Sequence, residues 1–317
     1  MTQVSGLISK LDSVALAKGA SLYAGMVFGI YWIPLRALEG AGFPGIWASV
    51  ALNAIPFVLL LPALALRAGR LLRYRATFQF GCLLLGLAYA VYASAFLFTQ
   101  VINVGVLYYL LPLGGCVRAR AVPGEAMTAV RWVAMFLGFL GIVFIFGTGG
   151  GIPIPRNLGD WMALASGFLW AAGSLLLLLD RESTPFDCGI AFVFWGTASA
   201  LILAIAAMAQ GVLPAPRLPF DPALLLWLAP VALLIVIPAS FATVYGPMVL
   251  NPGVVGLLFM TEISVGTATA AVLTDEPFAF PQICGILFVS AAGLLEITWP
   301  LMARRQDRDT GTPPGLQ

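Results

Sequence analysis

Glu262 is an acidic residue deep inside a long apolar segment, and it is the first candidate for chemistry in this sequence. It lies about 12 Å from the start of the segment Gly253–Leu273, if that segment is a helix rising about 1.5 Å per residue. In lipid an ionised carboxylate there costs several kcal/mol, so it must face a wet cavity, find a partner or be protonated. Two interpretations follow. Glu262 either binds an amine or couples a proton, or it holds helices together through Thr261, Ser264 or a neighbouring backbone.

Aromatic residues form a second group of candidates. Tyr and Trp usually lie at membrane interfaces, whereas several here fall in the middle of apolar segments, which is typical of a cavity wall. Adjacent helical residues differ in direction by about 100°, so we expect only one of Tyr108 and Tyr109 to line a cavity and the other to pack. Trp32 and Trp170 occupy matching places in the two halves of the chain, as cavity residues or in helix packing. The residues that we expect to line a cavity are Trp32, Tyr92, Asn103, Tyr108, Tyr109, Trp170, Tyr245 and Glu262.

Asparagines and prolines near segment ends make up a third group. Asn103 and Asn251 each stand near the start of a segment, where an asparagine either binds a carboxylate or, more commonly, caps a helix. Pro34, Pro112 and Pro238 each remove a backbone donor inside or near an apolar segment, so we predict helix breaks or hinges there.

Several kinds of chemistry are excluded or disfavoured by composition. The chain has no histidine, which excludes imidazole metal sites and histidine acid–base catalysis. Its four cysteines are far apart and lie mostly in apolar runs, so we interpret them as small core residues. No phosphate-binding loop, nucleophile elbow or Cys-x-x-Cys pair occurs. We therefore expect no cofactor, no metal, no nucleic-acid partner and no enzymatic activity.

The elements that position these residues are apolar helices. Of 317 residues, 61% are hydrophobic and only 9% are charged, against about 25% charged in an ordinary soluble domain. The apolar runs are long and uninterrupted, which favours membrane helices of about 20 residues over barrel strands. We predict ten spans: Leu16–Leu35, Gly45–Leu66, Ala76–Phe98, Val101–Val117, Thr128–Phe146, Leu158–Leu179, Gly189–Ala209, Ala223–Val244, Gly253–Leu273 and Gln282–Met302.

The basic residues predict the orientation of these spans. With the N-terminus inside, only Arg36, Arg156 and Arg217 lie outside, and the other 13 of the 16 basic residues lie inside. Because short cytoplasmic loops are enriched in Lys and Arg, we predict that both termini are cytoplasmic. The cluster between Arg67 and Arg75 is interpreted as part of this topological signal.

The chain divides into two halves of five spans each. Residues 1–146 form the first half, 147–157 a periplasmic linker rich in glycine, 158–302 the second half and 303–317 a cytoplasmic tail. Five spans per half place the halves in opposite orientations, which is the arrangement of an inverted repeat. Weak internal similarity agrees, since Gly29-Ile-Tyr-Trp32 is similar to Gly167-Phe-Leu-Trp170.

These features resemble the drug/metabolite transporter superfamily in its ten-helix, EamA-type branch. The resemblance rests on a Trp near the first helix of each half and on the string Val104-Gly-Val-Leu-Tyr-Tyr-Leu-Leu-Pro112 followed by Gly124-Glu125. The string Asn103–Pro112 is similar to the YddG-type aromatic amino-acid exporters in particular. Glu262-Ile263 departs from the Glu-Pro that is common in the family's second half.

The resemblance implies a secondary transporter of the bacterial inner membrane. It would export aromatic and other neutral amino acids and related small metabolites by alternating access. Proton coupling through Glu262 is an open possibility, and membrane lipid and the small-molecule substrate are the partners expected. The sequence does not determine the oligomeric state, and it is compatible with a monomer. The alternatives are efflux of drugs, quaternary ammonium compounds or nucleotide sugars, and, from other classes, a membrane-embedded enzyme or a channel.

Overall fold

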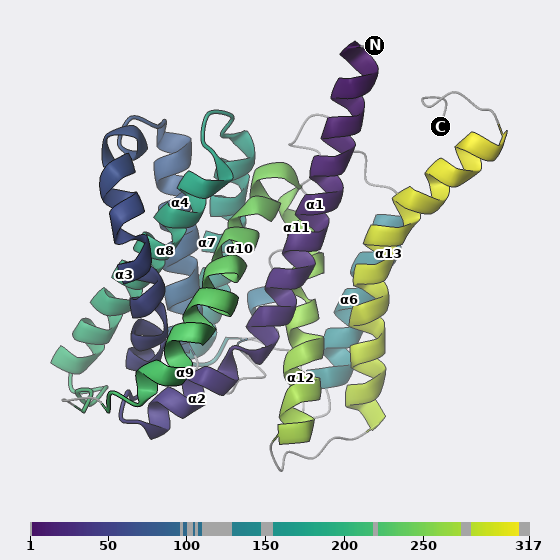
Figure 1. Ribbon diagram of the computed structural model, residues 1–317. Helices are drawn as coiled ribbons and strands as arrows, with labels where there is room; N and C mark the ends of the chain where they lie inside the picture. The colour runs from purple at the N-terminus through teal and green to yellow at the C-terminus, as the bar shows by residue number, and fades with distance from the viewer. Residues whose placement is uncertain are drawn as a thin grey trace.

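A computed structural model describes residues 2–95, 98–99, 104, 107–109, 129–146, 155–217, 221–273 and 280–310, and within these ranges the chain is helical without any strand. The helices, shown in Figure 1, are α1 (Thr2–Ile30), α2 (Trp32–Gly40), α3 (Ile46–Leu71), α4 (Ala76–Ala95), α6 (Ala129–Phe146), α7 (Leu158–Leu179), α8 (Pro185–Ala209), α9 (Leu224–Val231), a π-helical turn (Ala232–Val236), α10 (Ile237–Val249), α11 (Pro252–Phe259), α12 (Thr261–Leu273) and α13 (Phe280–Thr310).

The described helices make the chain a multi-pass membrane protein by length and composition. Seven segments are long and apolar enough to cross a membrane: Ser13–Gly40, Ile46–Leu71, Ala76–Ala95, Leu158–Leu179, Pro185–Ala209, Leu224–Val249 and Pro252–Leu273. Two shorter apolar helices, Trp132–Phe144 and Ile283–Leu295, coincide with the predicted fifth and tenth spans. The predicted fourth span, Val101–Val117, falls almost wholly outside the described residues.

Both terminal helices are longer than the apolar pattern predicted. α1 begins at Thr2 rather than at Leu16, and α13 continues past Met302 to Thr310. The apolar pattern marks only the part of a helix that lipid would cover. The residues after Met302 include Ala, Arg and Gln, which favour helix, and no glycine or proline interrupts them before Gly311.

Close helix pairs build the bundle. α4 packs most extensively against α7, and both α3 and α4 pack against α8, while α1 lies against α10 and α12. A Cβ added at Gly86 of α4 would lie 2.6 Å from the backbone nitrogen of Gly196 in α8. These two helices therefore touch backbone to backbone, which only small residues permit.

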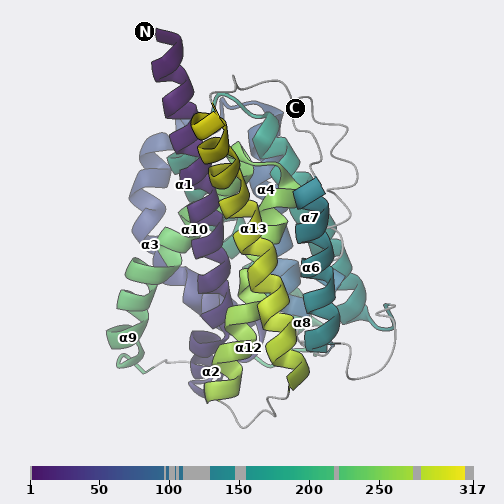
Figure 2. The same cartoon turned by 90° about the vertical axis from the view of Figure 1, so that its right-hand side faces the viewer.

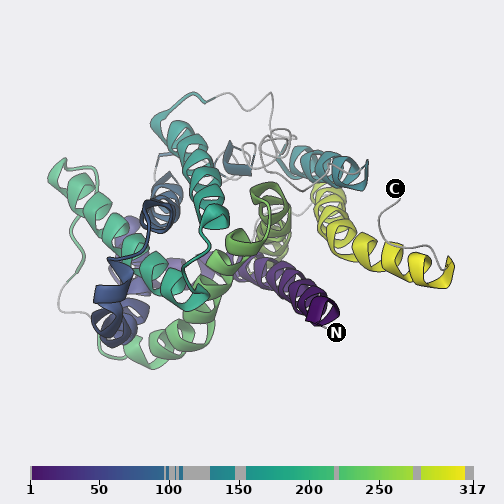
Figure 3. The same cartoon turned by 90° about the horizontal axis from the view of Figure 1, so that it is seen from above.

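The pair α6 and α13 lies at one side of the bundle (Figures 2 and 3). A Cβ at Gly141 would lie 2.8 Å from the carbonyl oxygen of Gly285 and still closer to the side chain of Val289. Gly141 and Gly285 thus let α6 and α13 approach closely.

The start of α1 and the end of α13 lie at the same end of the bundle, which we call the terminal end, and α2 lies at the opposite end (Figure 1). α3 returns from the α2 end, so its last turn and the first turn of α8 lie at the terminal end. Several arginines of the predicted cytoplasmic cluster, including Arg67 and Arg70, therefore share this end with the two termini.

Candidate functional site

The carboxyl group of Glu262 is held by two phenol hydroxyls from other parts of the chain. Tyr92 of α4 donates to Oε1 at 3.2 Å, and Tyr109 donates to Oε2 at 2.5 Å. One of the two interpretations from sequence named Thr261, Ser264 or a neighbouring backbone as the partner of Glu262, and the structure records Tyr92 and Tyr109 instead. The Thr261 hydroxyl donates to the carbonyls of Leu258 and Leu22, and the buried Ser264 hydroxyl has no partner among the described residues.

The helix that carries Glu262 is interrupted immediately before it. α11 ends at Phe259, and α12 begins at Thr261. The amide of Ile263 donates to the carbonyl of Met260 rather than to that of Phe259. The freed carbonyl of Phe259 accepts instead from the Tyr109 hydroxyl at 3.1 Å. Glu262 thus stands in the first turn of α12, where the helix dipole favours negative charge.

Aromatic rings enclose the carboxyl. The ring of Tyr108 lies 4.6 Å from that of Tyr92 and 4.8 Å from that of Tyr109, measured between centroids. Tyr109 reaches the carboxyl with its hydroxyl, whereas Tyr108 contributes ring contacts and has no hydrogen bond recorded within the described residues. The Trp170 ring lies 5.4 Å from Phe259. Two tyrosines therefore hold the acid directly, a third packs on both of them, and the Trp170–Phe259 pair lies at the helix interruption that precedes the acid.

The two tryptophans of the internal similarity lie in different surroundings. Trp170 is buried, and its indole N–H has no acceptor within the described part of the chain. Trp32 lies away from the Glu262 cluster, where its indole N–H donates to Thr269 at 3.2 Å and the Arg36 guanidinium lies 5.1 Å above its ring. Trp170 therefore keeps an unused indole N–H beside the ring of Phe259, whereas the indole N–H of Trp32 is already bonded.

The remaining predicted site residues lie outside this cluster or outside the described residues. Tyr245 of α10 is partly buried against the core, with no hydrogen bond recorded in the described ranges. Asn103 and Pro112 lie outside those ranges. Asn251 caps α11 by accepting from the amide of Gly253 at 3.0 Å, which confirms the capping prediction for that residue.

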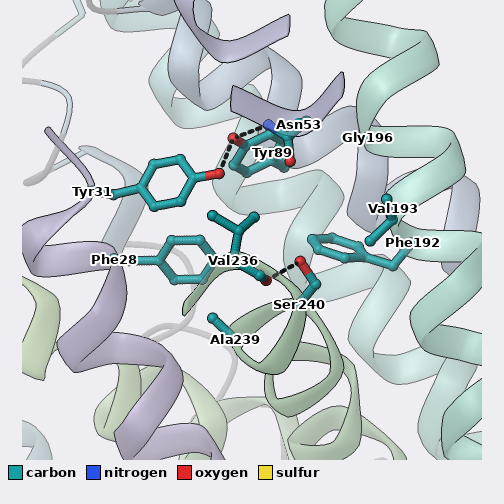
Figure 4. A pocket seen from close by; sticks show the side chains of 10 residues that line it. All are labelled: Phe28, Tyr31, Asn53, Tyr89, Phe192, Val193, Gly196, Val236, Ala239 and Ser240. Atoms are coloured by element: carbon teal, nitrogen blue, oxygen red, sulfur yellow. Dashed lines mark hydrogen bonds between the residues drawn. The ribbon is translucent and has the colours of Figure 1, made fainter. Parts of the chain in front are cut away.

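A small cavity beside the cluster was missed by the sequence analysis (Figure 4). Its volume is about 10 Å³, which is about the threshold for a single water molecule. Asn53 Nδ2 donates to the Tyr89 hydroxyl at 2.8 Å, and that hydroxyl donates to Tyr31 at 3.2 Å. The lining residues are Phe28, Tyr31, Asn53, Tyr89, Phe192, Val193, Gly196, Val236, Ala239 and Ser240.

Two irregular helix segments border this cavity, and a proline follows each. The break between α1 and α2 falls at Tyr31, three residues before Pro34, and the π-helical turn Ala232–Val236 comes just before Pro238. A proline has no N–H for the carbonyl four residues earlier, and its ring crowds that carbonyl, so the ladder is disturbed there. A third irregularity, the break at Met260, lies next to Glu262. The helices are thus irregular both at the cavity and at the acid.

An ion-pair cluster ties α3 to α8 at the terminal end. The Asp187 side chain is fully buried; it accepts from Arg67 at 2.7 Å and from the Tyr74 hydroxyl at 2.6 Å, and Arg70 lies 3.4 Å away. Burial, together with the hydrogen bond to Asp187, raises the pKa of Tyr74 above its ordinary value. Arg67 and Arg70, which we predicted to be a topological signal, are thus also partners of a buried acid. Asp187 lies in the first turn of α8, and nothing in the sequence around it indicates that Arg67 and Tyr74 are its partners.

The described residues include no group of three or more His, Cys, Asp or Glu side chains placed to hold a metal ion.

Comparison with known proteins establishes the fold alone. No model of a known protein family matches the chain, and no curated protein matches it either. A solved structure described only as "Crystal structure of protein" aligns over 92% of this chain and 98% of its own, with a TM-score of 0.67 and 17% sequence identity. The chain shares its fold with that structure, whose description names no function.

Proposed function

We propose that the protein is a secondary transporter that exports neutral amino acids and related amine-bearing metabolites by alternating access. The observation that carries this proposal is the placement of Glu262. One acid stands among tyrosine rings at a helix interruption, in the first turn of α12 and bonded to α4. Discontinuous membrane helices that meet near the middle of a bundle are the usual construction of transporter binding sites.

The chemistry of the enclosure fits an ammonium group. A carboxylate attracts the ammonium by charge, and the faces of Tyr and Trp rings add cation–π attraction. The free indole N–H of Trp170 is a donor for the carboxylate of the same molecule. A zwitterion would thus find a partner for each of its charges, and its apolar part would contact rings.

The helix packing supports ten helices in two inverted halves, as in the drug/metabolite transporter superfamily. A Cβ at Gly29 of α1 would lie 2.7 Å from the carbonyl oxygen of Glu262, and one at Gly167 of α7 would lie 2.5 Å from that of Tyr108. The first contact joins the first and ninth predicted spans, and the second joins the sixth and fourth. If each span is replaced by its counterpart in the other half, the first contact becomes the second. The α4–α7 and α10–α1 pairs are related in the same way.

Alternating access requires that the site be closed in some states and open in others. The cavity beside the Glu262 cluster has room for at most about one water, so we take the described arrangement as closed at this cavity. The Asp187 cluster joins α3 of the first half to α8 of the second at the terminal end. We propose that this end faces the cytoplasm of a bacterial cell, because the basic residues gather there, and that opening it to cargo separates Arg67 from Asp187.

A second candidate function is efflux of organic cations, including quaternary ammonium drugs. The same enclosure favours it, because an acid surrounded by aromatic rings suits any compact cation. The two functions differ in the need for a carboxylate on the cargo. Transport of an amino acid can therefore be compared with transport of its amide, in which an uncharged carboxamide replaces the carboxylate. An exporter of zwitterions prefers the amino acid, whereas a cation exporter prefers the amide.

Transport by purified protein in proteoliposomes tests the proposal. Proteoliposomes loaded with labelled aromatic and aliphatic amino acids should release them faster than loaded liposomes without protein. The Glu262→Gln variant should release them more slowly or no longer respond to a pH gradient. Glu182→Gln is the matched control, since this glutamate pairs with Arg75 on the surface and is 48% exposed. Absence of amino-acid flux under every gradient would contradict the proposal.

A further inference from the structure

We propose that Asn53 and Tyr31 form a neutral subsite that binds an uncharged hydrogen-bonding group on the side chain of the cargo. This inference rests on the proposed function, and it adds a preference for one class of side chain. The subsite occupies the cavity beside the Glu262 cluster (Figure 4). Both residues are more than nine-tenths buried.

The orientation of the Asn53 amide follows from a carbonyl on its own helix. Asn53 Nδ2 lies 2.8 Å from the carbonyl oxygen of Ser49. The flipped amide would place Oδ1 against that oxygen, with two acceptors facing each other. Nδ2 therefore faces Ser49, and its second N–H donates to the Tyr89 hydroxyl. Both N–H groups are used, and Oδ1 is left as an acceptor with no partner recorded in the described residues.

The recorded hydrogen bonds run from Asn53 through Tyr89 to Tyr31. The Tyr89 hydroxyl accepts from Asn53 and passes its own proton toward the Tyr31 oxygen, 3.2 Å away. The hydroxyl of Tyr31 accepts from Tyr89, and no hydrogen bond donated by Tyr31 itself is recorded among the described residues. Each donor in such a chain strengthens the next, so the Tyr31 hydroxyl is the polarised end of the chain. The cavity thus presents one donor and one acceptor.

The surroundings of this donor and acceptor select against charge. None of the ten residues lining the cavity is acidic or basic. A buried charge without a partner is far costlier than a buried neutral group that finds its hydrogen bonds. A hydroxyl, phenol or carboxamide satisfies both Tyr31 and Asn53. In the closed arrangement, a single water fits the cavity and can do the same.

The subsite lies one side chain away from the acid. Tyr89 and Tyr92 are three residues apart on one face of α4, about 5 Å along the helix axis, and Tyr92 donates to Glu262. The Phe28 ring, which lines the cavity, lies 6.4 Å from the ring of Phe259 beside the acid. A cargo whose ammonium meets Glu262 would therefore direct its side chain along these rings toward Tyr31.

Competition by pairs of amino acids that differ in one polar group tests the subsite. The pairs are tyrosine with phenylalanine and threonine with valine, assayed as competitors of labelled amino-acid exchange in proteoliposomes. With the wild-type protein, the hydroxyl-bearing member of each pair should compete about tenfold better, as expected for one hydrogen bond. Lysine and glutamate should compete poorly.

Two variants locate this preference. Tyr31→Phe removes the donor and keeps the ring, and Asn53→Leu removes the acceptor at similar size; each should remove the preference while phenylalanine and valine still compete. Tyr23→Phe, which removes a hydroxyl about two turns earlier on α1, should keep the preference.

The outcomes separate this inference from the proposed function. Exchange without discrimination within the pairs, or a preference that survives in Tyr31→Phe, overturns the subsite and leaves the transporter intact. Absence of exchange of any amino acid by the wild-type protein overturns the proposed function and the subsite with it. Because Asn53→Leu also removes the bond to Ser49, its unfolding temperature is measured, and the conservative Tyr31→Phe decides the result if Asn53→Leu unfolds.

Discussion

Tyr109 and Glu262 are 153 residues apart in the sequence, and the hydroxyl of one lies 2.5 Å from the carboxyl oxygen of the other. The same hydroxyl lies 3.1 Å from the carbonyl oxygen of Phe259. A single hydroxyl proton shared between two acceptors makes a strong hydrogen bond to only one of them at a time. If Glu262 is protonated, its own O–H can donate to Tyr109, which then donates to Phe259. The Tyr109 hydroxyl can thus donate to Glu262 when the carboxyl is ionised, and accept from it when the carboxyl is protonated.

Tyr109→Phe should therefore alter the response of transport to pH. Without the hydroxyl, the carboxyl keeps the longer bond from Tyr92, and the Phe259 carbonyl, freed by the helix interruption, loses the hydroxyl that donates to it. We expect the pH profile of exchange to shift and the maximal rate to fall by about tenfold, which corresponds to one hydrogen bond to a charged group. Exchange measured across a series of symmetrical pH values checks this.

Tyr108→Phe is the matched control for that experiment. It removes a neighbouring phenol oxygen that has ring contacts and no hydrogen bond recorded in the described ranges. We expect a smaller change in rate and an unshifted pH profile. Equal effects of the two substitutions would contradict the special role of the Tyr109 hydroxyl.

Asp187→Asn should loosen the terminal end. An amide offers one acceptor where the carboxylate offers two, so the bonds from Arg67 and Tyr74 cannot both remain. A hydrogen bond to a charged group is worth about 1.5–3 kcal/mol, so opening should become at least tenfold more frequent. Cys188, the next residue, is fully buried and reports the opening through the rate of maleimide labelling in a variant where it is the only cysteine.

Glu182→Gln in the same single-cysteine background is the comparison. It breaks the exposed pair with Arg75, and exposed pairs contribute about 0–1 kcal/mol. Labelling should change less than about twofold. If Asp187→Asn also leaves the labelling of Cys188 unchanged, the ion-pair cluster does not hold this end closed.

The helices and the candidate acid could be predicted from sequence because their signals are local. Apolar runs located the segment around Glu262, and the cost of a charge in such a run singled out this residue. Asn251 stood before a helix start, where capping is the ordinary role of asparagine. Each of these conclusions needs only neighbouring residues and the nature of lipid.

The partners of these residues could not be predicted, because they come from distant segments. Nothing near Glu262 indicates Tyr92 or Tyr109, and nothing near Asp187 indicates Arg67. The interruption at Met260 has no proline to announce it, unlike the one that precedes Pro34. A polar Asn53 in an apolar run was the one local sign of the missed cavity.

The predicted orientation can be tested with reporters at both chain ends and at the last residue of α2. Fluorescent protein fused to either terminus should mature, because it folds in the cytoplasm and fails to fold when exported unfolded. A cysteine replacing Gly40, which has open space around it, should react in intact cells with a maleimide that does not cross membranes. If this cysteine is labelled only after lysis and the fusions at both termini are not fluorescent, the orientation is the reverse of the predicted one.

Gly29→Ala should disturb the contact that positions Glu262. A Cβ there would lie 2.7 Å from the carbonyl oxygen of Glu262 and 2.9 Å from the amide nitrogen of Gly266, so α1 and α12 must separate. Forcing extra atoms into a packed core costs about 1–3 kcal/mol. We expect the apparent unfolding temperature in detergent to fall by several degrees and exchange to slow.

Gly19→Ala on the same helix is the control, because a Cβ there meets nothing within 4 Å. Alanine favours helix over glycine by about 1 kcal/mol, so this variant should be at least as stable as the wild type. The two substitutions make the same chemical change and differ only in what the added methyl group meets. If Gly29→Ala matches Gly19→Ala in unfolding temperature and exchange rate, then α1 does not approach α12 closely enough for backbone contact to set the position of Glu262.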